Sequence, residues 1–278
     1  MEDFNINSSS QNQSYDYSNT TSKYHIDPVE VVTCIIIAVG LPLTMVAIYS
    51  LYSMVRRDQV APIYVINLLI TDLIQFCYMI VEVAPPENPK IIFRNIYLSA
   101  LMASICFMVC ISLERYLVIA HPLWYRFRRT IKTSVVVCVL VWVLSPVCVV
   151  CFYFTDVRYI LFIIILLLPF PLLIFSLVGT LKALSASISV PSDEKRRIVG
   201  ILVLVLLIYT LLFLPSIILL LEEHYDLTLD LLSTIFLSLS PLADSVLYVF
   251  MRKGFIDKLL ASVCCCRMDS NDISSPSV

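Results

Sequence analysis

This chain has little charge and very little glycine. Only 14% of its 278 residues are charged and four are glycine, whereas 59% are hydrophobic. That much apolar surface cannot be hidden inside one soluble globule of normal composition. The composition therefore excludes an ordinary soluble domain and predicts a membrane protein.

Sequence signatures of several kinds of membrane protein are also missing. No HExxH or Gly-x-Gly-Asp motif of an intramembrane enzyme occurs, and residues 228–251 contain no lysine that could hold retinal. The repeated halves and broken helices that are common in transporters are not evident. We expect no enzymatic activity, no metal site and no nucleic-acid partner. A membrane scaffold that does not signal is the alternative that is hardest to exclude.

Long apolar stretches dominate what is present. Each is long enough to cross about 30 Å of hydrocarbon as a helix of about 20 residues. Continuous apolar runs lack the alternation of a barrel strand. The fold class is therefore all-α, a seven-transmembrane helix bundle, with spans near 30–54, 60–84, 91–119, 133–154, 159–185, 196–221 and 228–251.

Basic residues set the orientation of this bundle. With the N-terminus outside, 15 of the 19 Lys and Arg side chains face the inner side, and only Lys23, Lys90, Arg94 and Arg158 face outward. Cytoplasmic loops of membrane proteins carry such an excess. We expect a multi-pass protein of the plasma membrane whose helical domain spans residues 30–252.

Residues 1–29 form a polar tail that we place outside the cell. The tail is rich in Ser and Asn and has no apolar core of a signal peptide. It holds three N-x-[ST] sequons, at Asn7, Asn12 and Asn19, which are glycosylated only if they are lumenal. We expect an extracellular glycosylated tail, with chance occurrence of the sequons as the alternative.

The C-terminal residues 253–278 contain a second membrane signal. "FMRKGFIDKLLASV" is basic and amphipathic, so it predicts a short eighth helix along the inner leaflet. Cys264, Cys265 and Cys266 follow it directly and are expected to be palmitoylated. A metal site is the weaker alternative, because no histidine accompanies these cysteines.

Polar side chains inside the predicted helices are costly in lipid and therefore informative. Asp72 and Asp244 fall at similar depths in the second and seventh spans, and Ser104 and Ser240 can join them around a small hydrated cavity. Two neighbouring carboxylates cannot both ionise cheaply, so either one stays protonated or the pair binds a cation such as sodium. Alternatively, each carboxylate is solvated by its own water pocket, without coupling.

Several short motifs occur in a fixed order along the spans. They are "NLLITDLI" with Asp72, "LERY" with Glu114, Arg115 and Tyr116, Trp142, Pro169, "LFLP" with Phe213 and Pro215, and "DSVLY" with Asp244 and Tyr248. Together they resemble the rhodopsin-like (class A) G-protein-coupled receptors over about residues 30–262. Within this class, the chain most resembles the branch of proton-sensing and lysolipid-associated receptors. Two features are typical of that branch: Phe213 stands in place of a tryptophan, and the last motif begins with an aspartate, Asp244, where other receptors have an asparagine.

The resemblance implies roles for these residues. Glu114 would hold Arg115 at the cytoplasmic end of the third helix in the inactive state, and Arg115 would turn toward a heterotrimeric G protein when the sixth helix, with its Phe213 and Pro215 switch, swings out. Tyr248 shares a helix face with Asp244 and can link the polar cavity to that end. The expected function is transmission of an extracellular signal to G proteins.

The sequence departs from the family pattern at several positions. Lys90 stands where the third helix usually carries a disulfide cysteine, and only "FTDVR" separates the fourth and fifth spans. Ser245 replaces the seventh-helix proline and Thr44 the first-helix asparagine. Lys195 stands where many relatives have an acid facing Arg115. We therefore expect an open ligand entrance and either a weakened inactive state or poor signalling.

The ligand is the least determined feature. Histidine titrates near physiological pH, but only His25 and His224 can face outward. Proton sensing would therefore depend on Asp72 and Asp244, with Glu82, Glu222 and Glu223 as further outer acids. A lysolipid or another small ligand remains the alternative.

Overall fold

The computed structural model describes residues 28–55, 63–83, 90–121, 131–154, 158–186, 192–221 and 227–251. All secondary structure within these ranges is helical. The helices are α1 (Pro28–Val55), α2 (Ile63–Val83), α3 (Lys90–Ala120), α5 (Ile131–Phe154), α6 (Arg158–Leu167), α7 (Pro169–Ala186), α8 (Ser192–Leu221), α9 (Leu227–Ser238) and α10 (Ser240–Met251).

Seven membrane-spanning units arise from these helices. Six stretches are long and apolar enough to cross a membrane, one of them formed by α6 and α7 together, and the pair α9 and α10, bent by 40°, makes a seventh. The predicted spans agree with the observed helices to within four residues. The seven-helix fold class is therefore confirmed. The predicted amphipathic eighth helix lies outside the described residues.

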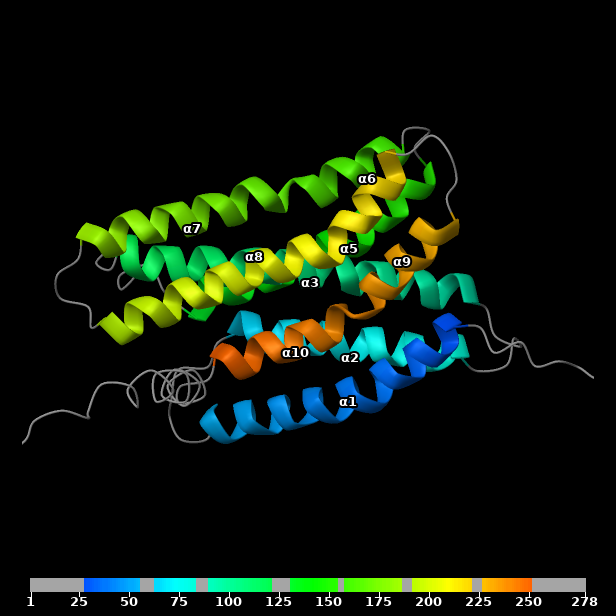
Figure 1. The fold of residues 1–278 in the computed structure, drawn as a ribbon, viewed down its shortest axis with the longest axis horizontal. Coiled ribbons are helices and arrows are strands. Elements are labelled where there is room, and N and C mark those ends of the chain that lie inside the picture. Colours follow the sequence, from blue (N-terminus) through cyan, green and yellow to red (C-terminus); the bar gives the residue numbers. More distant parts are fainter. Residues whose placement is uncertain are drawn as a thin grey trace, which may run out of the picture.

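Consecutive units run in opposite directions along one axis, which is horizontal in Figure 1, and α3 lies at the centre. This helix packs against α2, α5, α7 and α8, whereas α1 contacts α2, α9 and α10. We call the end of the bundle at which α3 finishes the Arg115 end, and the opposite end the Lys90 end. Because α3 touches so many neighbours, its side chains connect the interior of the bundle with the Arg115 end.

The outer surface of the bundle is strongly apolar. On α5, for example, Val136, Val139 and Val143 are each more than half exposed. Large contiguous apolar surfaces mark contact with lipid or protein, and an apolar belt around a helical bundle fits lipid. The interior instead holds Phe107, Phe213 and other large side chains together with several small polar ones.

Prolines break two of the spans, and a tyrosine from a neighbouring helix bonds to the backbone at each break. Pro241 has no N–H to offer the carbonyl of Leu237, and the hydroxyl of Tyr97 on α3 donates to that carbonyl instead, at 3.4 Å. At the break before Pro169, the Tyr209 hydroxyl of α8 donates to the Leu166 carbonyl. A backbone group freed within a membrane needs such a partner, which explains why the break at Pro241 is tolerated.

Candidate functional site

The predicted polar cavity residues meet near the middle of the bundle. Asp72 comes from α2, Ser104 from α3, and Ser240 and Asp244 from α10, and none of the four is exposed. Asp244 accepts a hydrogen bond of 2.9 Å from the Ser104 hydroxyl through its Oδ2 atom. The carboxyl groups of Asp72 and Asp244 lie close enough to interact electrostatically. We call these four residues and Gln75 the polar cluster.

Gln75 is a member that the sequence reasoning missed. It is fully buried in α2, three residues after Asp72, so the two side chains share one helix face. This spacing and the polarity of glutamine inside a predicted span were visible in the sequence. The expectation named two acids and two serines inside the spans and left this glutamine out.

Several atoms of the polar cluster have no hydrogen-bond partner among the described residues. They are both carboxyl oxygens of Asp72, Oδ1 of Asp244, the Ser240 hydroxyl and both amide atoms of Gln75. Buried polar atoms normally find partners, because leaving one unpaired costs about 1–3 kcal/mol. A group of them at one place is suited to hold a proton, a small cation or water.

The predicted coupling residues lie together at the Arg115 end of α3. Glu114, Arg115 and Tyr116 are all partly buried, and Arg115 Nε is buried without a hydrogen-bond partner in the described ranges. The ring of Tyr116 packs edge-on against Phe175 of α7, with ring centroids 5.3 Å apart. A guanidinium at the end of a central helix is placed to meet a partner that approaches this end of the bundle.

Comparison with known proteins supports the resemblance to rhodopsin-like receptors. A family profile described as "7 transmembrane receptor (rhodopsin family)" matches residues 43–159. G-protein coupled receptor 68 of Homo sapiens is 24% identical over 274 residues, which cover 81% of this chain and 73% of that receptor. The Mus musculus protein of the same name is 26% identical over the same shares. The chain is thus similar to the rhodopsin family of seven-transmembrane receptors over these stretches.

A shorter part of the receptor is similar to other members of that class. Free fatty acid receptor 3 of Homo sapiens is 33% identical over 122 residues, covering 38% of this chain and 34% of that protein. Proteins of this class are receptors, so the expectation that the chain is not an enzyme agrees with its relatives.

Phe213, one of the two predicted switch residues, lies in an aromatic stack. Phe213 is fully buried in α8, next to Tyr209 at a centroid distance of 4.7 Å, and Tyr209 in turn meets Phe170 at 4.9 Å. Pro215 lies within α8 and interrupts its backbone bonding just beyond Phe213. The structure therefore brings the predicted switch and the proline-broken fifth span into contact.

Two departures from the family pattern bond to each other. Thr44 of α1 and Ser245 of α10 are both fully buried, and their hydroxyl oxygens are 2.6 Å apart. A direct side-chain bond thus joins the first and seventh spans where the sequence lacks the usual asparagine and proline.

A second side-chain bond joins two other helices. The indole N–H of Trp142 on α5 donates to the amide oxygen of Asn67 on α2, at 2.9 Å.

Other predicted residues are placed more simply. Tyr248 is buried in α10, one turn after Asp244 and toward the Arg115 end, while Lys195 is partly buried near the start of α8. The predicted modification sites lie outside the described residues; these are Asn7, Asn12, Asn19, Cys264, Cys265 and Cys266.

Proposed function

We propose that this receptor transmits an extracellular signal to heterotrimeric G proteins and that protonation of the polar cluster forms part of the signal. The observation that carries the proposal is the pair of fully buried, neighbouring carboxyl groups of Asp72 and Asp244, three of whose four oxygens are unpaired in the described residues. Such a pair changes its charge when a proton or a cation enters.

A path from the cluster to the coupling end supports the proposal. Asp244 bonds to Ser104 of α3, and α3 runs on to Arg115, eleven residues or about 16 Å further along the helix. Tyr248 continues the path along α10. A small rotation of α3 or α10 after a charge change in the cluster would therefore move groups at the Arg115 end.

The Arg115 end faces the cytoplasm in this proposal, and the N-terminus is outside. The support is the distribution of basic residues, 15 of which fall on the side of Arg115. Glycosylation of Asn7, Asn12 or Asn19 follows from this orientation, and glycosidase treatment would detect it as a loss of mass. Acylation of Cys264, Cys265 or Cys266 would appear in acyl-exchange labelling and be absent from the triple Ser variant.

Sodium in the polar cluster, in place of a proton, is the second candidate. Carboxyl and hydroxyl oxygens are the ligands that a hard cation prefers, and the cluster offers both. A lysolipid or another small ligand remains a further possibility for the outer mouth, and a poorly signalling scaffold is the alternative outside the receptor class.

Agonist-free nucleotide exchange on purified G proteins, measured over a pH series, tests the proposal. The parent receptor should show a pH-dependent rate, and Arg115→Ala should lower the rate at least tenfold at equal receptor concentration. Arg94→Ala is the matched control, because Arg94 is an exposed arginine at the other end of the same helix. Unchanged exchange in Arg115→Ala would contradict the coupling role, and a rate independent of pH would contradict proton sensing.

A further inference from the structure

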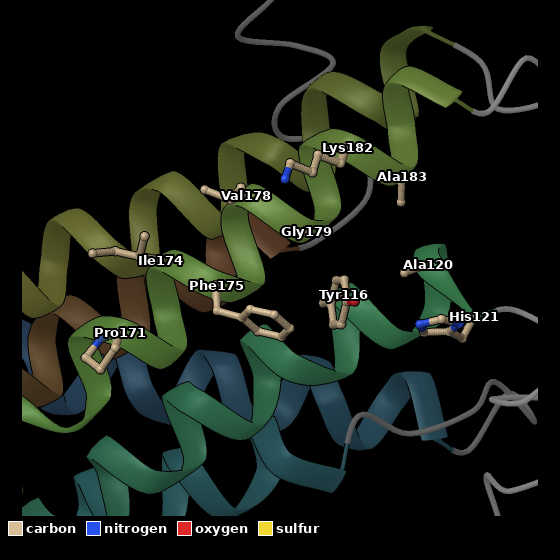
Figure 2. Close-up of a pocket in the computed structure, with 10 residues that line it drawn as sticks. All are labelled: Tyr116, Ala120, His121, Pro171, Ile174, Phe175, Val178, Gly179, Lys182 and Ala183. Carbon is tan, nitrogen blue, oxygen red and sulfur yellow. The ribbon is translucent and has the colours of Figure 1, made fainter.

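A groove of about 830 Å³ lies between the Arg115 end of α3 and the facing part of α7. Figure 2 shows its lining residues, with Tyr116, Ala120 and His121 on one wall and Pro171 to Ala183 on the other. Its volume is within the range of about 300–1,000 Å³ that is usual for ligand pockets. Neither the polar cluster nor the coupling role of Arg115 accounts for it.

The groove opens on the surface that lipid covers. Ile174, Phe175 and Val178 line it and are 48%, 55% and 43% exposed, respectively. All three belong to the apolar stretch Phe162–Ser185, which is long enough to span a membrane. Molecules reaching this opening therefore come from the bilayer, and an apolar chain is the group that suits the walls.

The polar residues of the groove gather at one end. Lys182 and His121 lie at the Arg115 end, where α3 finishes and α7 is within four residues of its own end, while Pro171 and Ile174 lie toward the middle of the bundle. Lys182 and Ile174 are eight residues apart, or about 12 Å along the helix. The groove is thus apolar along most of its length and basic at the level of the lipid headgroups.

One wall of the groove belongs to the coupling motif. Tyr116 fits against α7 because residue 179 is glycine: a Cβ there would come within 2.5 Å of the Tyr116 ring. The ring also meets Phe175 and His121 edge-on, at centroid distances of 5.3 and 6.2 Å. A chain in the groove would contact the residue that follows Arg115 directly.

We propose that this groove binds one anionic phospholipid from the leaflet at the Arg115 end. The acyl chain lies along Ile174, Phe175 and Val178, and the headgroup phosphate lies near Lys182. Charge complementarity selects the lipid, because a lysine near an anionic headgroup adds attraction that a zwitterionic lipid with no net charge does not receive. The bound chain holds Tyr116 against Gly179 and so couples lipid composition to the position of Arg115.

Native mass spectrometry of the full-length receptor tests this with two lipids that have the same acyl chains, phosphatidylglycerol and phosphatidylcholine. The parent should bind the first phosphatidylglycerol several-fold more tightly. Lys182→Gln should weaken that binding about fivefold and leave phosphatidylcholine unchanged. Val178→Trp, which fills the groove, should weaken both lipids.

Two control variants separate this site from general membrane contact. Lys132→Gln removes an exposed lysine on α5, and Leu181→Trp enlarges a side chain on α7 that is 45% exposed and does not line the groove. Both should bind like the parent. The proposal is overturned if Lys132→Gln matches Lys182→Gln, if Val178→Trp binds normally, if the two lipids bind equally, or if neither lipid binds. The assay needs no G protein, so its failure leaves the signalling proposal standing.

Discussion

The polar cluster and the lipid-facing groove both lie against α3, but they differ in nearly every physical property. The cluster is enclosed and polar, and it leaves Asp72, Gln75 and Ser240 atoms unpaired among the described residues. The groove is open and apolar, with Lys182 and His121 at one end. An enclosed cluster of acids responds to protons and small cations, whereas an open apolar groove responds to lipid. In the two proposals taken together, one helix carries two separate inputs to Arg115.

Removing one acid from the cluster should break this comparison most strongly. Activation by protonation requires the neutral acid, and Asp244→Asn removes the negative charge that opposes ionisation of Asp72. More protons are then needed, so the pH midpoint of G-protein activation should fall by roughly one unit. Nucleotide exchange measured over a pH series, at low and at high sodium, gives this midpoint.

Glu30→Gln is the control for that experiment, because Glu30 is an exposed acid in the first turn of α1 and lies outside the polar cluster. Its midpoint should match the parent. If Asp244→Asn keeps the parental midpoint at both sodium concentrations, the cluster does not sense protons. A fixed midpoint with altered sodium sensitivity assigns the cluster to a cation.

Variants at Thr44 and Ser245 test how much stability a buried hydroxyl loses when its hydrogen-bond partner is removed. Thr44→Val leaves the Ser245 hydroxyl buried without its partner, which should cost about 1 kcal/mol of stability. The double variant with Ser245→Ala should cost less than the sum of the single changes, because no unpaired hydroxyl remains. Thermal unfolding in detergent micelles measures both.

Thr210→Val serves as the reference for that cycle. The Thr210 hydroxyl donates only to the Leu206 carbonyl of its own helix, at 2.7 Å, so no partner on another helix is left unpaired. Its stability should change by less than that of Thr44→Val. Additive losses in the Thr44 and Ser245 pair would show that their bond does not hold α1 to α10.

Gly179→Ala should have the smallest effect, and it tests the groove side of the comparison. The new methyl group would meet the Tyr116 ring, which must turn into the groove. We expect phosphatidylglycerol binding to fall by about twofold, and the gain in helix stability from replacing glycine, roughly 0.5–1 kcal/mol, to be lost.

Gly200→Ala provides the matched case, because nothing lies within 4 Å of a Cβ at that position. This variant should keep its lipid affinity and gain the helix stability. Equal stabilisation by the two alanines would mean that Tyr116 has room to move and does not depend on Gly179.

Much of the fold was predictable because hydropathy is a local property. A stretch of about 20 apolar residues must cross the bilayer as a helix whatever its neighbours are, so the seven spans required no tertiary information. The same holds for the depth of Asp72 and Asp244 within their spans. Even Gln75 was accessible, since it lies one helical turn from Asp72.

Contacts between spans were not predictable in this way. Thr44 and Ser245 are 201 residues apart, and each was visible only as a departure from a motif. Their bond depends on how α1 and α10 are rotated about their axes. That rotation depends on the side-chain volumes of the whole bundle, and a single position in the sequence does not reveal it.

The sequence by itself determined the number of spans, the asymmetry of basic charge and the short motifs that resemble those of the rhodopsin family, because each of these depends on residues close together in the chain. Only the tertiary structure decided that Asp72 meets Asp244, that Thr44 pairs with Ser245, and that Gly179 lets Tyr116 border a groove. The physical reason is that a buried pair or a groove exists only once separate helices have packed, and packing depends on shape across the whole bundle.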